Sequence, residues 1–323
     1  MQDKTVIITG GNAGLGYQSA KNIAASDPAY HVVLACRSAS RGTAAAESLR
    51  GETGNPNVSA MTLDLASLAS VRTFHDEFSR AGHPALHAVV CNAGISANGM
   101  PGVTRTADGV EPIFGVNHLG HFLLTNLLLT NLLLTNLLLN QMESAGRIVF
   151  VTSDLHNPPP FFPVKVTYDN AAKIAHGKSG MPQYCVSKLC NLYCTYEMDR
   201  LLTERTDQHI TVNAFNPGAM SDTGFSRPTG NALTRAAVRI IGGAMGALMG
   251  KQSTSTQSGT ALAALVTDPQ FATLSGKYFD RGEEVKSSPL SYNRDNAREL
   301  WQSSMTLSGL TAPEMIFTSS PTC

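Results

Sequence analysis

Neither sign of charge is in excess in this 323-residue sequence, because Lys plus Arg and Asp plus Glu each number 24. The sequence also contains no basic block and no acidic tail. Proteins bind a nucleic acid backbone through clustered basic side chains, so this charge pattern excludes nucleic acid as the expected partner. With 42% hydrophobic residues, the chain can instead bury the large core of an ordinary globular protein.

Signs of metal binding and of secretion are also missing. The six cysteines include no C-x-x-C pair, which zinc and redox sites commonly use. Cys190 and Cys194 share one face of a predicted helix, but two thiols without a nearby pair of histidines make a poor zinc site, and we expect no metal. Most cysteines fall in predicted buried strands or in this helix, which indicates reduced thiols of a cytoplasmic protein. The sequence opens directly on a predicted strand, so a cleaved signal peptide is not expected.

A glycine-rich segment follows the first predicted strand, which runs from Lys4 to Thr9. It reads Gly-Gly-Asn-Ala-Gly-Leu-Gly and leads into a predicted helix that ends near Ser26. Glycines let a backbone turn tightly and approach a pyrophosphate, whose charge then faces the free N–H groups at the helix start. An ordinary glycine turn is the alternative. The residues predicted to contact a dinucleotide here are Gly10, Asn12, Gly14, Leu15 and Gly16.

Basic residues follow the second predicted strand, His31 to Cys36, where Arg37 and Ser38 come first and Arg41 is close behind. Dinucleotide sites that prefer NAD(H) usually place an acidic residue here, which accepts from the ribose 2′-hydroxyl. A guanidinium instead suits a 2′-phosphate and can stack on adenine. The sequence therefore predicts NADP(H) as the cofactor, with a solvated surface arginine as the alternative.

Predicted strands and helices then alternate, with strands at 58–63 and 86–91 and a helix between them at 68–81. Alternation of this kind is typical of the α/β, doubly wound Rossmann fold, whose mostly parallel sheet is flanked by helices. We expect a sheet of about seven strands in a single domain over residues 1–285. A C-terminal helix and tail would then occupy residues 286–323.

Two short motifs come directly after predicted strands, at the end of the sheet where such folds bind their ligand. Asp64 and Leu65 follow the third strand, where the acid could accept from the adenine amino group. Asn92, Ala93 and Gly94 follow the fourth, where a turn of small residues lets the backbone lie against the cofactor. Both could equally be ordinary loops, since Asp and Asn-Gly clusters mark turns in general.

Tyr184 and Lys188 are four positions apart in a predicted helix, which places them on one helix face about one turn apart. A positive charge held beside a phenol favours the phenolate. We therefore expect the lysine to lower the pKa of the tyrosine toward the range useful for proton exchange. Such pairs also arise by chance on helices. The glycine segment far upstream is the observation that supports a catalytic role for this pair.

Several motifs follow one another in a fixed order: T-G-x-x-x-G-x-G at 9–16, Asp64-Leu65, Asn92-Ala93-Gly94, Asn117 in V-N-H-L-G, Ser153, Tyr184-x-x-x-Lys188 and Asn216-Pro217-Gly218. In this order the sequence resembles the short-chain dehydrogenase/reductase family over roughly residues 4–280. It is most similar to the branch of light-dependent protochlorophyllide reductases and retinol-dehydrogenase-like carbonyl reductases. Cys190 is similar to a cysteine of the protochlorophyllide enzymes, but the insertion between Ser153 and Tyr184 differs from theirs.

The resemblance implies a catalytic tetrad of Asn117, Ser153, Tyr184 and Lys188. Ser153 would hold the substrate oxygen against Tyr184, which donates a proton as hydride arrives at the carbonyl carbon, or removes it in the reverse direction. Lys188 would lower the pKa of the tyrosine and bond the nicotinamide ribose. Asn117 would order a water that links the lysine to solvent.

The resemblance also places Pro217 and Gly218 beside the nicotinamide. The family often has a threonine four residues beyond this glycine, which bonds the carboxamide, but here that position is Asp222. An acid would repel the carboxamide oxygen, so we expect Thr223 to make the contact. The stretch near 222–255 is apolar and glycine-rich in its second half, which fits a mobile lid over an apolar substrate, with core packing as the alternative.

A five-residue unit that contains Thr-Asn is repeated between Leu123 and Leu139. A five-residue period spreads the Thr-Asn pairs around a helix, so no face is cleanly apolar. A membrane span would tolerate the asparagines poorly. We expect this helix to lie in a homo-oligomer interface, as the equivalent helix of the family often does, with membrane contact and local irregularity as alternatives.

These observations together predict a cytoplasmic NADP(H)-dependent oxidoreductase that transfers hydride to a carbonyl, or to an activated C=C bond, of a bulky apolar small molecule. One alternative is a light-dependent protochlorophyllide-type reductase. Another is a catalytically idle NADP(H)-binding sensor or scaffold, against which the presence of Ser153 argues, because a pure binder has no use for it.

Overall fold

An eight-stranded sheet forms the centre of the computed structural model, which describes residues 3–98, 100, 102–138, 146–205, 210–220, 222 and 252–311, with backbone alone at 130–138 and 205. Neighbouring strands run parallel except β10, which pairs antiparallel with β9. Across the sheet the strands are β10 (Glu283–Val285), β9 (Tyr278–Asp280), β6 (Ile210–Asn216), β5 (Gly146–Val151), β4 (Leu86–Cys91), β1 (Lys4–Thr9), β2 (Tyr30–Cys36) and β3 (Val58–Thr62). A separate parallel pair consists of β7 (Ala219–Met220) and β8 (Gln252–Ser253).

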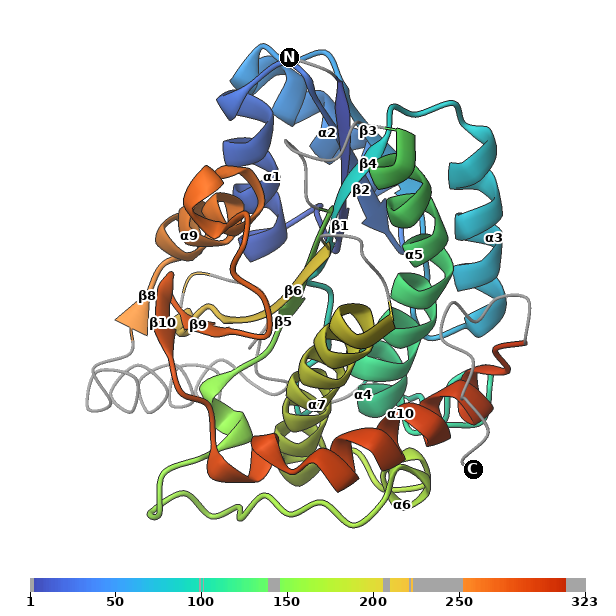
Figure 1. The fold of residues 1–323 in the computed structure, drawn as a ribbon, viewed down its shortest axis with the longest axis vertical. Coiled ribbons are helices and arrows are strands. Elements are labelled where there is room, and N and C mark those ends of the chain that lie inside the picture. The colour runs from blue at the N-terminus through green and yellow to red at the C-terminus, as the bar shows by residue number, and fades with distance from the viewer. Residues whose placement is uncertain are drawn as a thin grey trace.

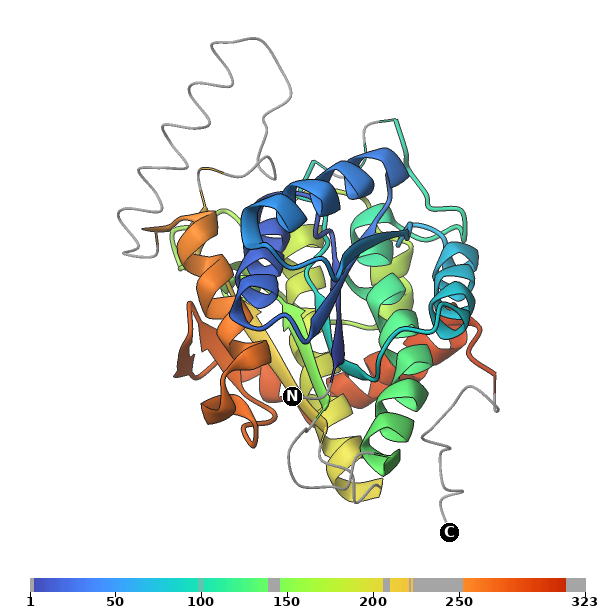
Figure 2. The ribbon, with the colours of Figure 1, turned by 90° about the horizontal axis from the view of Figure 1, so that it is seen from above.

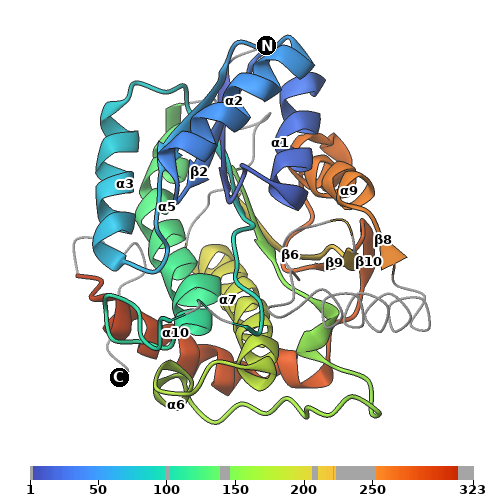
Figure 3. The same cartoon turned by 180° about the vertical axis from the view of Figure 1, so that it is seen from behind.

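Helices cover both faces of the sheet, as the front, top and rear views show (Figure 1, Figure 2 and Figure 3). One face is covered by α1 (Gly14–Ser26), α2 (Ala39–Thr53) and α9 (Ser255–Thr267). The other is covered by α3 (Leu68–Arg80), α5 (Gly120–Leu138) and α7 (Met181–Arg205). The short helices are α4 (Pro112–Phe114), the π-helix η1 (Gly115–Leu119), α6 (Ala171–Ala175) and the 3₁₀ turns η2 (Asp154–His156), η4 (Pro269–Phe271) and η5 (Pro289–Tyr292).

Alternation along the strands creates these two cores. In β1, Val6 and Ile8 pack toward α1 and α9, whereas Ile7 packs toward α3 and α5. Successive side chains of a strand point to opposite faces, so a strand covered on both sides reads as the continuous apolar run seen here. The predicted doubly wound parallel fold is confirmed.

The sheet has one strand more than the predicted seven. The additional strand, β10, has three residues, all of them exposed, so it lacks the hydrophobic signal by which strands are found in a sequence. The predicted helix near the C-terminus is α10 (Arg294–Ser308), whose first turn is capped by Asn293. It packs across α7 and α5 (Figure 1). There Trp301 of α10 meets Phe122 of α5 edge to face.

The strand order changes direction between β1 and β4, because the chain first builds β2 and β3 on one side of β1 and then β4 to β6 on the other. In such sheets the ligand crevice lies at the carboxyl ends of the strands on either side of this point. The turns that follow β1 and β4 are therefore where a cofactor is expected.

The first copy of the Thr-Asn repeat is buried in α5 rather than presented on a surface. Thr125 Oγ1 donates to the backbone oxygen of His121 at 2.8 Å, and Asn126 Nδ2 donates to the backbone oxygen of Phe122 at 2.8 Å. Both polar side chains therefore form hydrogen bonds within their own helix. The leucines at 127–129 belong to the core. The side chains of the later copies lie outside the described residues, and the oligomer interface there stays a prediction.

Within the described part of the chain, no helix has both the length and the apolar character needed to cross a bilayer. Over the same residues, no three His, Cys, Asp or Glu side chains are grouped so that they could hold a metal ion. Cys36, Cys91, Cys185, Cys190 and Cys194 are all buried free thiols.

Candidate active site

The glycine turn between β1 and α1 favours glycine for conformational and steric reasons. Gly10 and Gly14 have positive φ angles of 66° and 53°. A Cβ at Gly16 would lie 2.5 Å from Asn92 Nδ2 and 2.6 Å from the oxygen of Gly10. Ala13 precedes the helix and has no side chain that could accept from the N–H groups of the first turn. The start of α1 is therefore suited to an anion such as pyrophosphate.

The backbone after β4 is held directly against this turn. Thr9 Oγ1 accepts from the N–H groups of Asn92 and Ala93, both at 2.9 Å. The Asn92 side chain donates in return to the oxygen of Thr9 at 2.8 Å. The structure thus brings together the predicted residues that follow β1 and those that follow β4.

The predicted residues after β2 and β3 lie farther along the same edge of the sheet. Arg37 and Arg41 are exposed, and Ser38 caps α2 by accepting from the N–H of Arg41 at 3.4 Å. Asp64 accepts from the N–H of Ala66 at 3.0 Å and is half-buried.

Leu65, in contrast, is buried in the core among α3 and α5, so its side chain does not line the crevice. A Cβ at Gly120 would lie 2.6 Å from the oxygen of Leu65, which shows how closely α5 approaches this strand end. Only the backbone of Leu65 is left for the predicted contact with the cofactor.

Asn117 lies in η1, the π-helical bend that leads into α5, and its side chain is fully buried. Its Oδ1 accepts from the N–H of Ile95 at 2.8 Å, while its Nδ2 donates to the oxygen of Ile95 and to Ser187 Oγ, both at 3.1 Å. Short π-helical segments inside α-helices are frequent at functional sites. The amide ties the loop after β4 to α7.

Lys188 comes next on α7 and is also buried, with its Nζ donating to the oxygen of Val151 at 3.1 Å. The same Nζ is 5.7 Å from the ring centroid of Tyr184. A Cβ at Gly94 would lie 3.2 Å from Asn117 Oδ1 and 3.7 Å from Lys188 Nζ. Four predicted residues from distant parts of the sequence therefore meet at one place.

Ser153 follows β5 and completes this group. Its hydroxyl donates to Asp154 Oδ1 at 3.2 Å, accepts from the N–H of Leu155 at 3.2 Å and is near enough to Tyr184 to influence the pKa of that phenol. Tyr184, with 9% of its surface exposed, and the half-buried Ser153 thus present two hydroxyl groups side by side. Both hydroxyls can donate to one substrate oxygen if the Ser153 proton, which here is donated to Asp154 Oδ1, rotates toward that oxygen.

The expectation that Lys188 lowers the pKa of Tyr184 is wrong for this structure. Burial raises the pKa of Tyr184 well above its usual value, with Cys185 and Asp154 adding to the rise and the hydrogen bond from Ser153 opposing it. Burial also lowers the pKa of Lys188 to about 8. Lys188 Nζ donates to the backbone oxygen of Val151, and burial outweighs the other influences on the pKa of Tyr184. Tyr184 is therefore a neutral phenol that retains a proton to donate.

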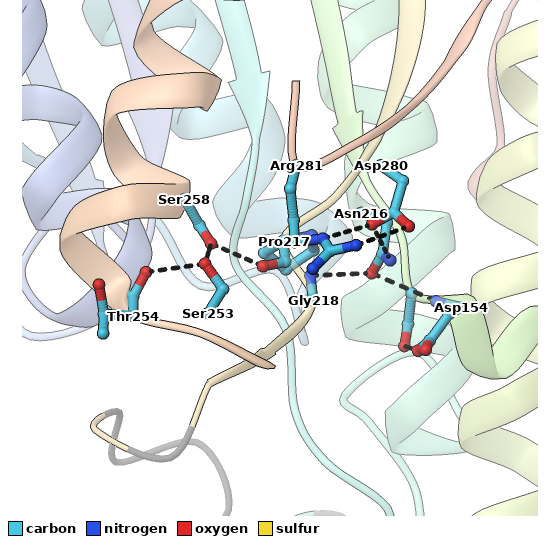
Figure 4. Close-up of polar contacts among 10 residues, drawn as sticks. Asp154, Asn216, Pro217, Gly218, Ser253, Thr254, Ser258, Asp280 and Arg281 are labelled. Atoms are coloured by element: carbon cyan, nitrogen blue, oxygen red, sulfur yellow. Dashed lines mark hydrogen bonds and ion pairs between the residues drawn. The ribbon is translucent and has the colours of Figure 1, made fainter. Parts of the chain in front are cut away.

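Asn216, at the end of β6, organises the backbone on the other side of Ser153 (Figure 4). Its Oδ1 accepts from the N–H groups of Asp154 and Gly218, both at 3.2 Å. The oxygen of Pro217 accepts from Ser258 Oγ of α9 at 2.6 Å. The predicted residues Pro217 and Gly218 are thereby fixed beside the Ser153 turn, with Gly218 at a positive φ of 75°.

Asp222 has a role that the sequence did not reveal. Its carboxylate accepts from the N–H of Ser255 at 2.9 Å and from Ser255 Oγ at 2.7 Å, at the start of α9. A carboxylate is stabilised at this end of a helix, so the acid has a partner other than a carboxamide. Thr223 and the predicted lid, apart from Asp222 and residues 252–255, lie outside the described residues.

Three residues that organise the site were not among the predicted contacts: Thr9, Ser187 and Asn216. Each stands inside or directly beside a motif that was recognised in the sequence. A polar residue at the last position of a buried strand was the available signal for Thr9 and Asn216, because a buried polar side chain requires partners.

The chain is similar over most of its length to proteins of one family. A model of the short chain dehydrogenase family matches residues 4–233. Retinol dehydrogenase 13 of Homo sapiens is 35% identical over 312 residues, which cover 97% of this chain and 86% of that protein. Chloroplastic protochlorophyllide reductase A of Oryza sativa subsp. japonica is 34% identical over 334 residues, covering 96% of this chain and 82% of the relative.

A solved structure agrees with the fold. An uncharacterized protein from Mycobacterium paratuberculosis has a TM-score of 0.66 and 28% identity, with 95% of this chain and 94% of that chain covered. The resemblance to both the retinol dehydrogenase and the protochlorophyllide reductase branches is confirmed by these relatives. The chain belongs to the short-chain dehydrogenase family of oxidoreductases.

Proposed function

We propose that this protein is an NADP(H)-dependent oxidoreductase that transfers hydride to a carbonyl, or to an activated C=C bond, of a bulky apolar small molecule, with Tyr184 as the proton donor. One observation carries this proposal: the neighbouring hydroxyls of Ser153 and Tyr184 lie beside Lys188 and Asn117, and Ser153 follows the carboxyl end of β5 as the glycine turn follows that of β1.

The residues present fit a dinucleotide. Gly10, Gly16 and Gly94 bring the turns after β1 and β4 and the Asn117 side chain close together, since a Cβ at each would meet neighbouring protein atoms at 3.2 Å or closer. The N–H groups at the start of α1 suit a pyrophosphate, and we propose that Asp64, which follows β3, accepts from the adenine amino group. When bound, a nicotinamide cofactor supplies the hydride, and the protein supplies placement and proton transfer.

The proton chemistry follows from the burial of the tyrosine. A phenol whose pKa is raised keeps its proton at neutral pH and can donate it to a substrate oxygen that gains negative charge. Ser153 holds that oxygen through a second hydrogen bond. Lys188 carries the nearby positive charge below about pH 8, where it can also bond ribose hydroxyls.

The Asn117 side chain has only one position left at which it could bind the water that the family resemblance implies. Both protons of its amide are taken by Ile95 and Ser187, and one lone pair of Oδ1 is taken by the N–H of Ile95. The second lone pair of Oδ1 is the position on this side chain at which the proposed water would donate.

The preference for NADP(H) rests on the end of β2. Arg37 and Arg41 are exposed there, and no acidic residue stands between Cys36 and Glu47 in the sequence. An exposed guanidinium at this place can bond a 2′-phosphate bidentately. Replacing Arg37 by Asp should raise KM for NADPH at least tenfold and lower that for NADH, whereas Arg50→Asp, at the far end of α2, should leave the ratio unchanged.

The proposal of an apolar substrate rests on the relatives, since retinol and protochlorophyllide are both large and mainly apolar. Similarity to protochlorophyllide reductase A keeps a light-driven reaction as a second candidate. The buried position of Cys190 among α7, α4 and α10 argues against it, because a thiol with no exposed surface cannot reach a substrate. Turnover of protochlorophyllide only under illumination would favour the second candidate.

The deciding experiment is a screen of NADPH oxidation over ketones, aldehydes, quinones and enones. Wild type should consume NADPH with at least one apolar substrate, and Tyr184→Phe should lose most of this activity. Tyr193→Phe is the matched control, since Tyr193 is a buried tyrosine of the same helix whose hydroxyl bonds Leu290 at 3.0 Å. Equal NADPH consumption by wild type and Tyr184→Phe with every compound would leave the idle sensor or scaffold as the better description.

A homo-oligomer, a cytoplasmic location and the absence of membrane contact remain part of this proposal. Sedimentation of the purified protein and fractionation of cells would test them separately.

A further inference from the structure

His121 lies one helical turn after Asn117, at the start of α5, and is completely buried. Its Nε2 is 2.9 Å from Oγ1 of Thr9, and its Nδ1 is 3.3 Å from the backbone oxygen of Asn117. Thr9 ends β1 directly before the glycine turn. One imidazole therefore links the end of β1, directly before the glycine turn, to η1, the π-helix that contains Asn117.

The same two points are also joined through the loop after β4. Thr9 Oγ1 accepts from the N–H groups of residues 92–93, and Ile95 exchanges two hydrogen bonds with the side chain of Asn117. With His121 added, the hydrogen bonds and the backbone of residues 93–95 form a closed ring that runs from Thr9 through Gly94 to Asn117 and back to Thr9. Every member of a closed ring restricts the others, so removal of the imidazole would leave Thr9 and Asn117 joined only through the loop that contains Gly94.

The protons of this ring can be assigned by counting donors. Thr9 Oγ1 has one proton and two lone pairs, and both lone pairs are taken by the N–H groups of residues 92–93. Its proton must go to an acceptor, which is His121 Nε2 at 2.9 Å or the oxygen of Val90 at 3.3 Å. The oxygen of Asn117 can only accept, so Nδ1 of His121 carries the proton.

The surroundings agree with this assignment. Burial lowers the pKa of His121 to about 3, the bond to the oxygen of Asn117 acts in the opposite direction, and the charge of Lys188 lowers it further. The ring is therefore uncharged near neutral pH. A neutral imidazole has one donor and one acceptor, which is what Asn117 and Thr9 require.

We propose that His121 is a positioning residue of the active site, whose Nδ1-protonated imidazole locks the glycine turn and the Gly94 loop to the bend that holds Asn117. It touches neither substrate nor cofactor. The inference rests on the proposed dinucleotide site, but its first test does not require activity.

The first test observes the imidazole directly. In ¹⁵N-labelled protein, the resonances that disappear in His121→Gln should show a protonated Nδ1 and an unprotonated Nε2, unchanged between about pH 6 and 8. A proton on Nε2, or an imidazolium in this range, would overturn the proposal. This result does not depend on whether the chain binds NADP(H).

The second test measures NADP(H) binding and turnover in variants of similar size. His121→Leu removes both hydrogen bonds and should weaken NADP(H) binding about tenfold or more. His121→Gln places an amide oxygen where Nε2 lies, so it should recover most of the affinity through Thr9 while kcat stays low. The control is His87→Leu, because His87 is buried and bonds the oxygen of Val266 at 3.2 Å, at the opposite end of β4.

Normal NADP(H) binding by His121→Leu, or binding by His121→Gln that is no better than by His121→Leu, would contradict the proposal. An equal loss of affinity in His87→Leu would also contradict it, because general destabilisation would then explain the effect. If wild-type protein binds neither NADP(H) nor NAD(H), the proposed function fails, and the ¹⁵N measurement still decides the role of His121.

Discussion

Asn216 donates a hydrogen bond of 2.9 Å from Nδ2 to the carboxylate of Asp280, which joins the ends of β6 and β9 (Figure 4). Asp280 is further held by Arg281, whose own N–H donates to the oxygen of Asn216 at 2.9 Å. The other end of the Asn216 amide fixes the backbone at Asp154 and Gly218. One buried side chain thus connects the end of β9 to the turn that presents Ser153.

Replacement of Asn216 by Ala is expected to damage both stability and catalysis. It leaves the half-buried N–H groups of Asp154 and Gly218 and the Asp280 carboxylate without this partner, so the free energy of unfolding should fall by about 2–4 kcal/mol. The Ser153 turn loses its anchor, and kcat should fall about tenfold or more. Urea denaturation and turnover at saturating NADPH would measure the two effects.

Asn213→Ala is the matched control for this prediction. Asn213 is buried in the same strand and also bonds two backbone groups, those of Leu274 at 2.7 Å and Lys277 at 3.0 Å, but it lies away from Ser153. It should lose comparable stability and keep kcat. If both variants lose kcat in proportion to stability, Asn216 has no separate part in placing the serine.

Gly16→Ala should abolish tight cofactor binding, because the added Cβ would lie within 2.6 Å of both Asn92 Nδ2 and the oxygen of Gly10. The turn must open to relieve this contact, and the loop after β4 moves with it. We expect NADP(H) to bind at least tenfold more weakly, as measured by calorimetry. Gly51→Ala is the control: nothing lies within 4 Å of a Cβ there, and the change should add about 0.5–1 kcal/mol of stability to α2.

The sequence was sufficient to predict the elements that carry strong local signals. The strand from Lys4 to Thr9, the glycine turn and the helix to Ser26 agree with β1 and α1 because periodicity and glycine spacing are local properties. The same is true of β4, and α10 lies within the C-terminal region where a helix was predicted.

What could not be predicted depends on contacts between distant segments. The partners of Asn216 and His121 are fixed by which strand ends meet, and a sequence alone does not state this. The pKa of Tyr184 was predicted in the wrong direction because the helix spacing gives the distance to Lys188 but not the degree of burial. Asp222 was interpreted through the family pattern, whereas its observed partner, Ser255, is supplied by α9.

The low pKa of Lys188 makes a prediction about the pH dependence of catalysis. The amine is protonated below its pKa of about 8 and loses its charge as the pH rises through that value. The pKa of Tyr184 is raised, so the phenol does not lose its proton over the same range. For carbonyl reduction, kcat/KM should be flat from about pH 6 to 7.5 and then fall, approaching tenfold per pH unit.

Lys188→Met tests this assignment, since methionine fills similar space without a titrating group. The variant should have much lower kcat/KM at every pH, and its profile should lack the fall above pH 8. A fall at the same pH in the variant would assign the titration to another group.

Buried histidines predict how the fold responds to acid. Burial lowers the pKa of His118 to about 3, while the unfolded chain binds a proton near the usual value of about 6.5. Between these values the unfolded state binds more protons than the folded state, so stability is fully present above pH 6.5 and is lost as the pH falls below it. Near pH 5 this histidine alone should contribute about 1.4 kcal/mol per pH unit to the slope.

His118→Gln removes the titration and can still bond Ser304, the partner of Nε2 at 2.9 Å in α10. Its free energy of unfolding should be lower than that of wild type at pH 7.5. Between pH 6 and 5, however, this free energy should decline less steeply than in wild type, by the contribution of one proton, about 1.4 kcal/mol per pH unit. Urea denaturation at several pH values separates the constant loss, which reports packing, from the change in slope, which reports the buried neutral imidazole. If the dependence of the unfolding free energy on pH is the same in the variant, His118 already binds a proton in the folded protein. The contact between α10 and η1 would then contain a charged imidazolium.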